Sequence, residues 1–365
     1  MFSYRRLVAR NPLLNSIIIH TVFWVISYLL LSTILFFTRK AMIETFSLPV
    51  DIRLWPFLLN SLIVGLLFGA GMGVVDHYFE KYIVTSMSLG MALVVKTILA
   101  VVILLMAFFL RKQVLFDLFT SHAFTNGNLM NADPIWKYLL YVMLIYTFIM
   151  ALVINFMRQV NKKFGPGILL PLLLGKYRKP REEERIFMFM DLKSSTTIAE
   201  SLGHLTFSAF IRDTFMDVNK VLIPYNTEIY QYVGDEIILS WKKETGLRDH
   251  SCVRFFFACK KHFNERADHY KKNYGTVPEF KASLHIGKVT VVEIGDIKRD
   301  IAYHGDTMST AARIQELCSE YNKRLLISDR FNKTIGLTPG FRTEELGDIL
   351  LKGKKSSIGI LSVED

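Results

Sequence analysis

The apolar residues of this chain gather in its N-terminal half, where long runs with few charges predict helices that cross a membrane. A bilayer crossing takes about 20 helical residues. Four runs reach that length, at 13–37, 55–75, 86–110 and 136–157, and each is flanked by arginine, lysine or aromatic residues. The first run is too long, and too poor in small residues at its end, for a cleavable signal peptide. We therefore expect a four-helix transmembrane domain over residues 1–157.

Basic residues beside the first and fourth runs predict how this domain is oriented. They are Arg5, Arg6 and Arg10 before the first run, and Arg158, Lys162, Lys163, Lys176, Arg178, Lys179 and Arg181 after the fourth. By the positive-inside rule, both termini and the C-terminal half face the cytoplasm, with the chain in a plasma or bacterial inner membrane. Two basic pairs, at 39–40 and 111–112, fall on the outer side and reduce the asymmetry.

Three polar residues inside the expected spans stand out, because ionisable groups are costly in a bilayer. His20 and His77 lie toward the cytoplasmic ends, where they could bridge a haem or a metal ion. Hydrogen bonding at a helix interface is the interpretation that we favour. For Lys96 we favour snorkelling, or pairing with a neighbouring helix, over a ligand pocket that faces outward.

A juxtamembrane linker is expected over residues 158–185. Its glycines and prolines, which include Gly165, Pro166 and Pro171, exclude one straight helix. A short amphipathic helix on the membrane, or a dimer contact through residues 168–174, is one interpretation. A stiff connector is the other.

From residue 186 the pattern becomes that of an α+β domain. A buried strand ends in Asp191 and is followed by small hydroxyl residues, with Ser194 or Ser195 as a helix cap. Two helices follow over 197–222, broken near Gly203, and then a hairpin that turns at Gly234. The remaining predictions are a helix at 247–271, strands at 279–286 and 288–294, a helix at 306–321, and strands near 324–328 and 345–361. This order is the split βαβ order of a ferredoxin-like fold.

Two aspartates are predicted to meet at one end of that sheet. Asp191 ends the first strand and Asp235 lies in the hairpin turn, and these strands are neighbours in a ferredoxin-like order. Two carboxylates that close repel each other unless a cation lies between them. Oxygen ligands with open positions suit Mg²⁺ or Mn²⁺, and the backbone N–H groups of residues 192–196 could hold phosphates. The pattern therefore favours a two-metal phosphoryl site.

Composition changes this picture little. The net charge of +11 could indicate a nucleic-acid partner, but part of it is the juxtamembrane cluster, which would face anionic lipid. No regular stripe of basic and aromatic residues occurs elsewhere, so we expect no nucleic-acid binding. The three cysteines all lie in the C-terminal half, without zinc spacing, as in a reducing cytoplasm.

At the level of motifs, residues 182–362 resemble the class III nucleotidyl cyclases, the catalytic domain of adenylate and guanylate cyclases. "FMFMDLKSST" and "YQYVGDEIILSW" are similar to the two metal-aspartate segments of that family. "HIGKVTVVEIG" is similar to its central hairpin, "IAYHGDTMSTAARIQ" to its glycine-to-arginine helix, and "LLKGKKSSIGIL" to its closing basic turn. Five motifs in the right order are more specific than any one of them.

The resemblance implies roles residue by residue. Asp191 and Asp235, with Leu192 beside them, would hold two Mg²⁺ or Mn²⁺ ions per active site. Arg313 would neutralise charge on the α-phosphate in the transition state, and Lys352 would contact the terminal phosphates. The segment that would hold the phosphates comprises Leu192, Lys193, Ser194, Ser195 and Thr196.

Three positions depart from the family pattern. Ser309 stands where Asn is usual, and Ala302 stands where an Asp or Thr usually reads the purine. The purine-reading Lys has no strict counterpart, since the spacing falls on Glu279, and Lys281 is the chemically sensible substitute on the same strand face. The choice of base is the property that these departures affect.

The resemblance also implies a homodimer in which the aspartates of one chain face Arg313, Lys352 and the base-reading residues of the other. We expect a membrane-bound adenylate cyclase that converts ATP to 3′,5′-cyclic AMP and pyrophosphate. The alternatives are a cyclase for GTP or a pyrimidine nucleotide, and a catalytically weak signalling or scaffold dimer, which Ser309 and Ala302 motivate. The "VGDEI" turn also resembles that of diguanylate cyclases, but the helix around Arg313 argues against that family.

Overall fold

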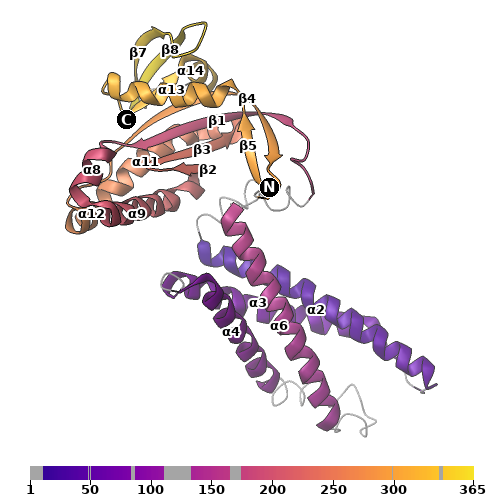
Figure 1. Ribbon diagram of the computed structural model, residues 1–365. Helices are drawn as coiled ribbons and strands as arrows, with labels where there is room; N and C mark the ends of the chain where they lie inside the picture. Colours follow the sequence, from indigo (N-terminus) through magenta and orange to yellow (C-terminus); the bar gives the residue numbers. More distant parts are fainter. Residues whose placement is uncertain are drawn as a thin grey trace. The chain divides into compact units, whose positions relative to one another are not determined.

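The computed structural model describes residues 11–47, 49, 51–83, 87–110, 133–164, 174–297, 299–336 and 340–365. The chain divides between Pro166 and Gly167 into two compact units, which are described separately below. The first unit is helical and the second is a mixed sheet with helices on both faces (Figure 1). The fold class expected from the sequence is therefore confirmed.

The helical unit contains the apolar runs as helices α2 (Pro12–Thr45), α3 (Leu54–Tyr82), α4 (Leu89–Leu110) and α6 (Asp133–Phe164). Three stretches are long and apolar enough to cross a membrane: Pro12–Thr45, Leu54–Tyr82 and Lys137–Asn161. The corresponding stretch of α4, Gly90–Met106, is shorter. The described residues thus supply three helices of spanning length, whereas the sequence predicts four spans.

Helices α2 and α3 pack with their backbones in close contact. Gly65, Gly69 and Gly73 of α3 face α2, and a Cβ atom added to them would lie 2.6, 2.5 and 2.4 Å from the Cα atoms of Val25, Thr21 and Ile17. Small residues at this spacing let membrane helices approach closely. The two helices therefore form a tightly packed pair, on which later arguments depend.

The second unit is built on one sheet with strand order β2-β3-β1-β4-β6-β8-β7, and β5 pairs with β4. The strands are β1 (Arg181–Leu192), β2 (Glu228–Val233), β3 (Glu236–Lys242), β4 (Phe280–Ile294), β5 (Asp300–His304), β6 (Leu325–Ser328), β7 (Arg342–Ile349) and β8 (Ile358–Glu364). The helices are α8 (Ser195–Leu202), α9 (His204–Leu222), α10 (Lys243–Leu247), α11 (Ser251–Glu265), α12 (Ala267–Tyr274), α13 (Asp306–Glu320) and α14 (Asp329–Ile335).

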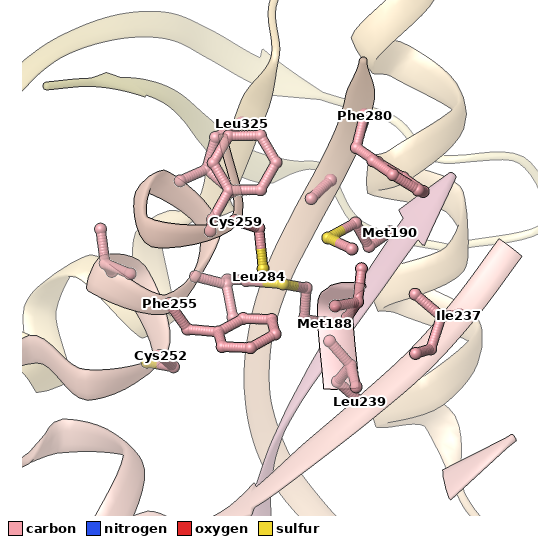
Figure 2. Packing of buried hydrophobic residues seen from close by; sticks show 14 of the residues in the cluster. Met188, Met190, Ile237, Leu239, Cys252, Phe255, Cys259, Phe280, Leu284 and Leu325 are labelled. Carbon is pink, nitrogen blue, oxygen red and sulfur yellow. The ribbon is translucent and has the colours of Figure 1, made fainter. Parts of the chain in front are cut away.

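The side chains of β1 point alternately to the two faces of the sheet. Met188 and Met190 belong to the largest core, where Phe255 and Cys259 of α11 cover the sheet (Figure 2). Phe187 and Phe189 point to the opposite face, into a smaller cluster that includes Ala311 of α13. Because side chains alternate along a strand, Asp191 lies on this second face, toward α13.

Several elements match the pattern read from the sequence. The helix break at Gly203 is present, with a φ of 72° that favours glycine, and the hairpin of β2 and β3 turns at Gly234. The expected helix at 247–271 is instead divided into a 3₁₀ helix (Arg248–His250), α11 and α12, with a break between the last two at Arg266. Helix α14 was not expected.

One strand prediction is wrong. Residues 280–294 form the single strand β4, not two strands separated at Gly287, and the hairpin turn comes after Ile294. Strand β1 pairs with β4 without interruption from Leu192 opposite Phe280 to Arg181 opposite Val291. Gly287 instead serves close packing, since a Cβ there would lie 2.4 Å from Thr307 Oγ1.

His285, buried in β4, is expected to make the stability of this unit depend on pH. Its Nδ1 lies 2.7 Å from Ser328 Oγ, and burial, with Arg330 and Lys354 nearby, lowers its pKa from 6.5 to about 4. Between these values the unfolded chain binds a proton that the folded chain excludes. The contribution of His285 to the free energy of unfolding should therefore be complete above about pH 6.5. The free energy of unfolding should fall by up to about 3 kcal/mol as the pH is lowered to about 4.

Thermal unfolding at about pH 7 and about pH 5 measures this contribution. Wild type should lose more thermal stability on acidification than His285→Gln, which has no group to protonate at this position. Equal losses in the two proteins would show that His285 does not contribute.

Candidate active site

Three carboxylates meet at one end of the sheet. Asp191 lies next to the end of β1, directly opposite Glu236, the first residue of β3, and Asp235 precedes Glu236 in the hairpin turn. Burial and the neighbouring Asp235 raise the pKa of Asp191 above its usual value. Burial, Asp191, Asp235 and Glu316 raise the pKa of Glu236 to about 7. Among the residues that the structure describes, the site therefore concentrates negative charge that is not fully compensated.

This arrangement fits a divalent cation. Like charges held together at a partly buried site are relieved by a cation, and Mg²⁺ and Mn²⁺ prefer carboxylate oxygens. Within the residues that the structure describes, no cluster of three or more His, Cys, Asp or Glu side chains forms a ready metal cage. Two carboxylates suffice for an ion that completes its shell with water, backbone oxygen and phosphate, as Mg²⁺ does. Asp191 and Asp235 therefore fit such an ion.

Lys281 lies beside the aspartates of its own chain. It is the register partner of Asp191 on β4, and its Nζ is 3.7 Å from Asp191 Oδ2 and donates a hydrogen bond to Ser319 Oγ at 2.7 Å. Glu279, on which the strict family spacing falls, precedes β4 and accepts a hydrogen bond from Arg324 at 3.1 Å. Both candidate base-reading positions thus lie at the same sheet end as the carboxylates.

The segment predicted to hold phosphates leads from β1 into α8. Leu192 is buried and ends β1, and Ser194 occupies the N-cap position of α8 with a φ of 58° but without a side-chain capping bond. The backbone N–H of Lys193 donates to the carbonyl of Glu279 at 2.8 Å, so it is not available to a phosphate. The N–H groups of Ser195 and Thr196, in the first turn of α8, remain suited to that role.

The cationic residues lie together at a different place in the fold. Arg313 of α13 points to the turn between β7 and β8, where a Cβ added to Gly353 would be 3.3 Å from its Nη2. Lys352 is exposed in that turn, whereas its neighbour Lys354 pairs with Asp306 at the start of α13. Ser309 is exposed one helical turn before Arg313, on the same helix face.

Ala302 lies in β5, opposite Val292 of β4, and is 6% exposed. It adds no hydrogen bond to the site through its methyl side chain. The structure thus groups the predicted residues into two sets, the carboxylate set around Asp191 and the cation set around Arg313.

Strand register separates the two sets along the sheet. Asp191 is level with Lys281 near the start of β4, while β8 begins at Ile358, which the pairings through β6 place level with Gly287. Six residues of strand correspond to about 20 Å, and three strand spacings across the sheet add about 14 Å sideways. The turn that carries Lys352 therefore starts at the opposite end of the sheet from Asp191.

The two sets are also separated around helix α13, since its side chains face them in different directions. Gln315 faces Asp191, and its hydrogen bond partly offsets the rise in the pKa of that carboxyl, whereas Arg313, two residues earlier, lies against Gly353. Residues two apart on a helix point in nearly opposite directions. Each chain thus presents a carboxylate half-site and a cation half-site that face different ways.

Glu236 and Gln315 are functional candidates to which the sequence assigned no role. The sequence contained a signal for Glu236. This residue follows Asp235 at the start of a predicted strand, and pairing of that strand with the strand before Asp191 places it opposite Asp191. Gln315 had no such signal, since its side depends on how α13 is rotated against the sheet.

The comparisons with known proteins agree with the fold of the second unit. The sequence model of the adenylate and guanylate cyclase catalytic domain matches residues 178–361, half of the chain. The chain therefore belongs to this family, and the resemblance to class III nucleotidyl cyclases is confirmed.

Two curated relatives are also similar. The chain is 34% identical over 220 residues to "Adenylate cyclase 2" of Rhizobium meliloti (strain 1021), which covers 60% of this chain and 61% of the relative. It is 23% identical over 180 residues to "Adenylate cyclase" of Anabaena cylindrica, which covers 48% of this chain and 36% of the relative. The chain thus matches less than two thirds of the length of either relative.

Among solved structures, the adenylyl cyclase CyaB from P. aeruginosa is 18% identical, with a TM-score of 0.44 over 51% of this chain and 96% of that chain. A bacterial light-regulated adenylyl cyclase is 19% identical, with a TM-score of 0.49 over 66% of this chain and 67% of that chain.

Proposed function

We propose that this protein is a membrane-bound adenylate cyclase that converts ATP to 3′,5′-cyclic AMP and pyrophosphate. The observation that carries the proposal is the convergence of Asp191 and Asp235 at one sheet end, beside the start of α8. Carboxylates that hold divalent cations next to free helical N–H groups suit a triphosphate. The R. meliloti relative, named an adenylate cyclase, supports ATP as the substrate.

Each residue has a role in this proposal. Asp191 and Asp235, with the Leu192 backbone beside them, would hold two Mg²⁺ or Mn²⁺ ions, and such ions supply nucleophile activation and charge neutralisation on the phosphates. The N–H groups of Ser195 and Thr196 bind phosphate oxygens and fix the α-phosphorus in line with the ribose 3′-oxygen. This positioning favours the intramolecular displacement, in which the 3′-hydroxyl loses its proton, its oxygen bonds to the α-phosphorus, and the bond to the leaving pyrophosphate breaks.

The cation set would come from a second copy of the chain. Arg313 binds the α-phosphate as negative charge grows there, and Lys352 binds the terminal phosphates of the leaving pyrophosphate. Ser309, on the same face of α13 as Arg313, supplies a hydroxyl toward the nucleotide. The separation of the two half-sites within one chain supports a homodimer, because two copies can place each carboxylate half-site against a cation half-site.

The helical unit would anchor the enzyme in the membrane, with the catalytic unit in the cytoplasm. Its three helices of spanning length and the apolar side chains exposed along them, such as Ile26 at 63% and Leu67 at 70%, support a lipid environment. The basic residues that follow α6 support the cytoplasmic orientation.

Incubation of the purified full-length protein with Mn²⁺ and each nucleoside triphosphate in turn tests this proposal. Cyclic AMP and pyrophosphate in equal amounts from ATP are the expected products. Cyclic GMP or a cyclic pyrimidine nucleotide as the main product would show a different base preference, to which Ala302 and Glu279 would contribute. No cyclic nucleotide from any triphosphate would contradict the assignment and favour a scaffold role.

A further inference from the structure

A cluster of charged and polar side chains lies inside the helical unit, where the proposed function does not use it. Asp76 of α3 is 2% exposed, and its carboxylate pairs with cations from two other helices. Lys96 Nζ of α4 lies 2.8 Å from its Oδ1, and Arg158 Nη1 of α6 lies 2.5 Å from its Oδ2. Ser16 of α2 donates to Oδ2 at 3.2 Å. One carboxylate therefore joins α2, α3, α4 and α6.

His20 of α2 also belongs to this cluster. Histidine is the side-chain type that ordinarily changes charge near neutral pH. The His20 side chain is 1% exposed, and among the described residues neither ring nitrogen has a hydrogen-bond partner. Its Nε2 lies 3.5 Å from Asp76 Oδ2. A buried polar group without a partner is energetically unfavourable. A protonated His20 ring could form an ion pair with Asp76 that the neutral ring cannot form.

The charges around His20 determine what an added proton does. Those that face it or its partner are Asp76 and Glu80 on α3, Lys96 on α4, which pairs with both, and Arg158 on α6. Among the described residues, two carboxylates and two cations lie here, so a proton on His20 adds a further positive charge beside the same carboxylates. Arg158 is 21% exposed, against 6% for Lys96. Arg158 can therefore return to water at the lower cost.

Arg158 lies near the end of the helix that leads toward the catalytic unit. The helix α6 ends at Phe164, within one to two turns of Arg158. Since α2 and α3 are packed backbone to backbone, the contact between Asp76 and Arg158 ties the end of α6 to a rigid pair. Farther along, the Tyr146 hydroxyl of α6 donates to the Ser27 carbonyl of α2 at 2.6 Å, which leaves α6 attached when the ion pair opens.

We propose that His20 is a proton-binding site through which the helical unit regulates the cyclase. When His20 takes up a proton from solvent, it pairs with Asp76 and displaces Arg158, which frees the last turns of α6. The change in α6 alters the alignment of the two catalytic units and so the rate of product formation. This inference rests on the proposed function for its activity readout, but proton binding is measurable without it.

The test uses the full-length protein in lipid nanodiscs over about pH 5.5 to 8. Three variants are compared with wild type: His20→Gln, Arg158→Gln and, as a matched control, His77→Gln, which replaces a half-buried histidine beside Asp76 in sequence. Activity of wild type and His77→Gln should change by about threefold or more relative to His20→Gln across this range. Arg158→Gln lacks the ion pair that a proton on His20 would open. At every pH, the ratio of its rate to that of His20→Gln should therefore equal the ratio that wild type reaches at low pH.

Tryptophan fluorescence gives a second readout that needs no activity. Trp24 is buried one helical turn from His20, so a protonated ring at His20 should quench its emission. The pH-dependent quenching should be present in wild type and His77→Gln and absent in His20→Gln. Effects of pH on the catalytic unit are common to all four proteins and cancel in the comparison.

Two results would overturn the proposal. One is a fluorescence titration that is the same in His20→Gln and wild type, because His20 then binds no proton in this range. The other is an activity profile that His20→Gln shares with wild type. A complete lack of cyclic nucleotide in all four proteins would contradict the proposed function, and the fluorescence titration would still decide whether His20 binds a proton.

Discussion

Replacing Asp235 with alanine is expected to lower cyclic AMP formation by about 1,000-fold or more, while the dimer and the fold remain intact. Asp235 lies in the turn between β2 and β3, outside the core, so its loss leaves no cavity. With one carboxylate gone, the site loses half of its side-chain ligands for divalent cations. Loss of the charge stabilisation that the metal ions provide raises the activation free energy by several kcal/mol. Steady-state assays with Mn²⁺ and ATP measure the effect.

A matched control is available in the same sheet. Asp296 lies in the turn between β4 and β5, and it takes no part in the carboxylate set. Asp296→Ala should keep activity within about twofold of wild type, because it alters a hairpin turn without touching the site. If Asp235→Ala retained substantial product formation while size-exclusion chromatography showed a normal dimer, the metal assignment would be wrong.

Two inactive variants are expected to restore activity when they share a dimer. Asp235→Ala damages the carboxylate half-site, and Arg313→Ala damages the cation half-site at the other end of the sheet. In a mixed dimer, one of the two active sites combines the intact halves. Random assembly of equal amounts makes half of the dimers mixed, so co-expression should give about one quarter of wild-type activity.

The control for this experiment combines two variants of the same half-site. Asp191→Ala mixed with Asp235→Ala should stay inactive, since no pairing of these chains completes a carboxylate pair. Failure of the Asp235→Ala and Arg313→Ala mixture to recover, with mixed dimers shown by differential tags, would mean that each chain builds its own site. That result would also contradict the register argument that separates the two half-sites.

Local signals in the sequence were sufficient for the parts of the fold that depend on neighbours along the chain. The continuous apolar run before Asp191 predicted β1 as a buried strand, and Gly203 and Gly234 marked a helix break and a hairpin turn that require positive φ. The meeting of Asp191 and Asp235 followed from topology, because antiparallel neighbours bring the end of one strand to the start of the next.

Features that depend on distant partners were not predictable in this way. Gly287 has the appearance of a turn residue, but its role is set by Thr307 of α13 packing against it. The N–H of Lys193 is taken by the Glu279 carbonyl, which is remote in sequence. In the helical unit, pairing of Lys96 with a neighbouring helix was anticipated, but its partners Asp76 and Glu80 depend on how the helices are rotated.

Counting bound Mn²⁺ by electron paramagnetic resonance, with a non-reactive ATP analogue present, tests the central claim most directly. The account predicts two ions per active site in wild type and the loss of this binding in Asp191→Ala and in Asp235→Ala. Binding of Mn²⁺ in either variant at the wild-type number and affinity would show that these carboxylates do not hold the ions, and the proposed site would have to be abandoned.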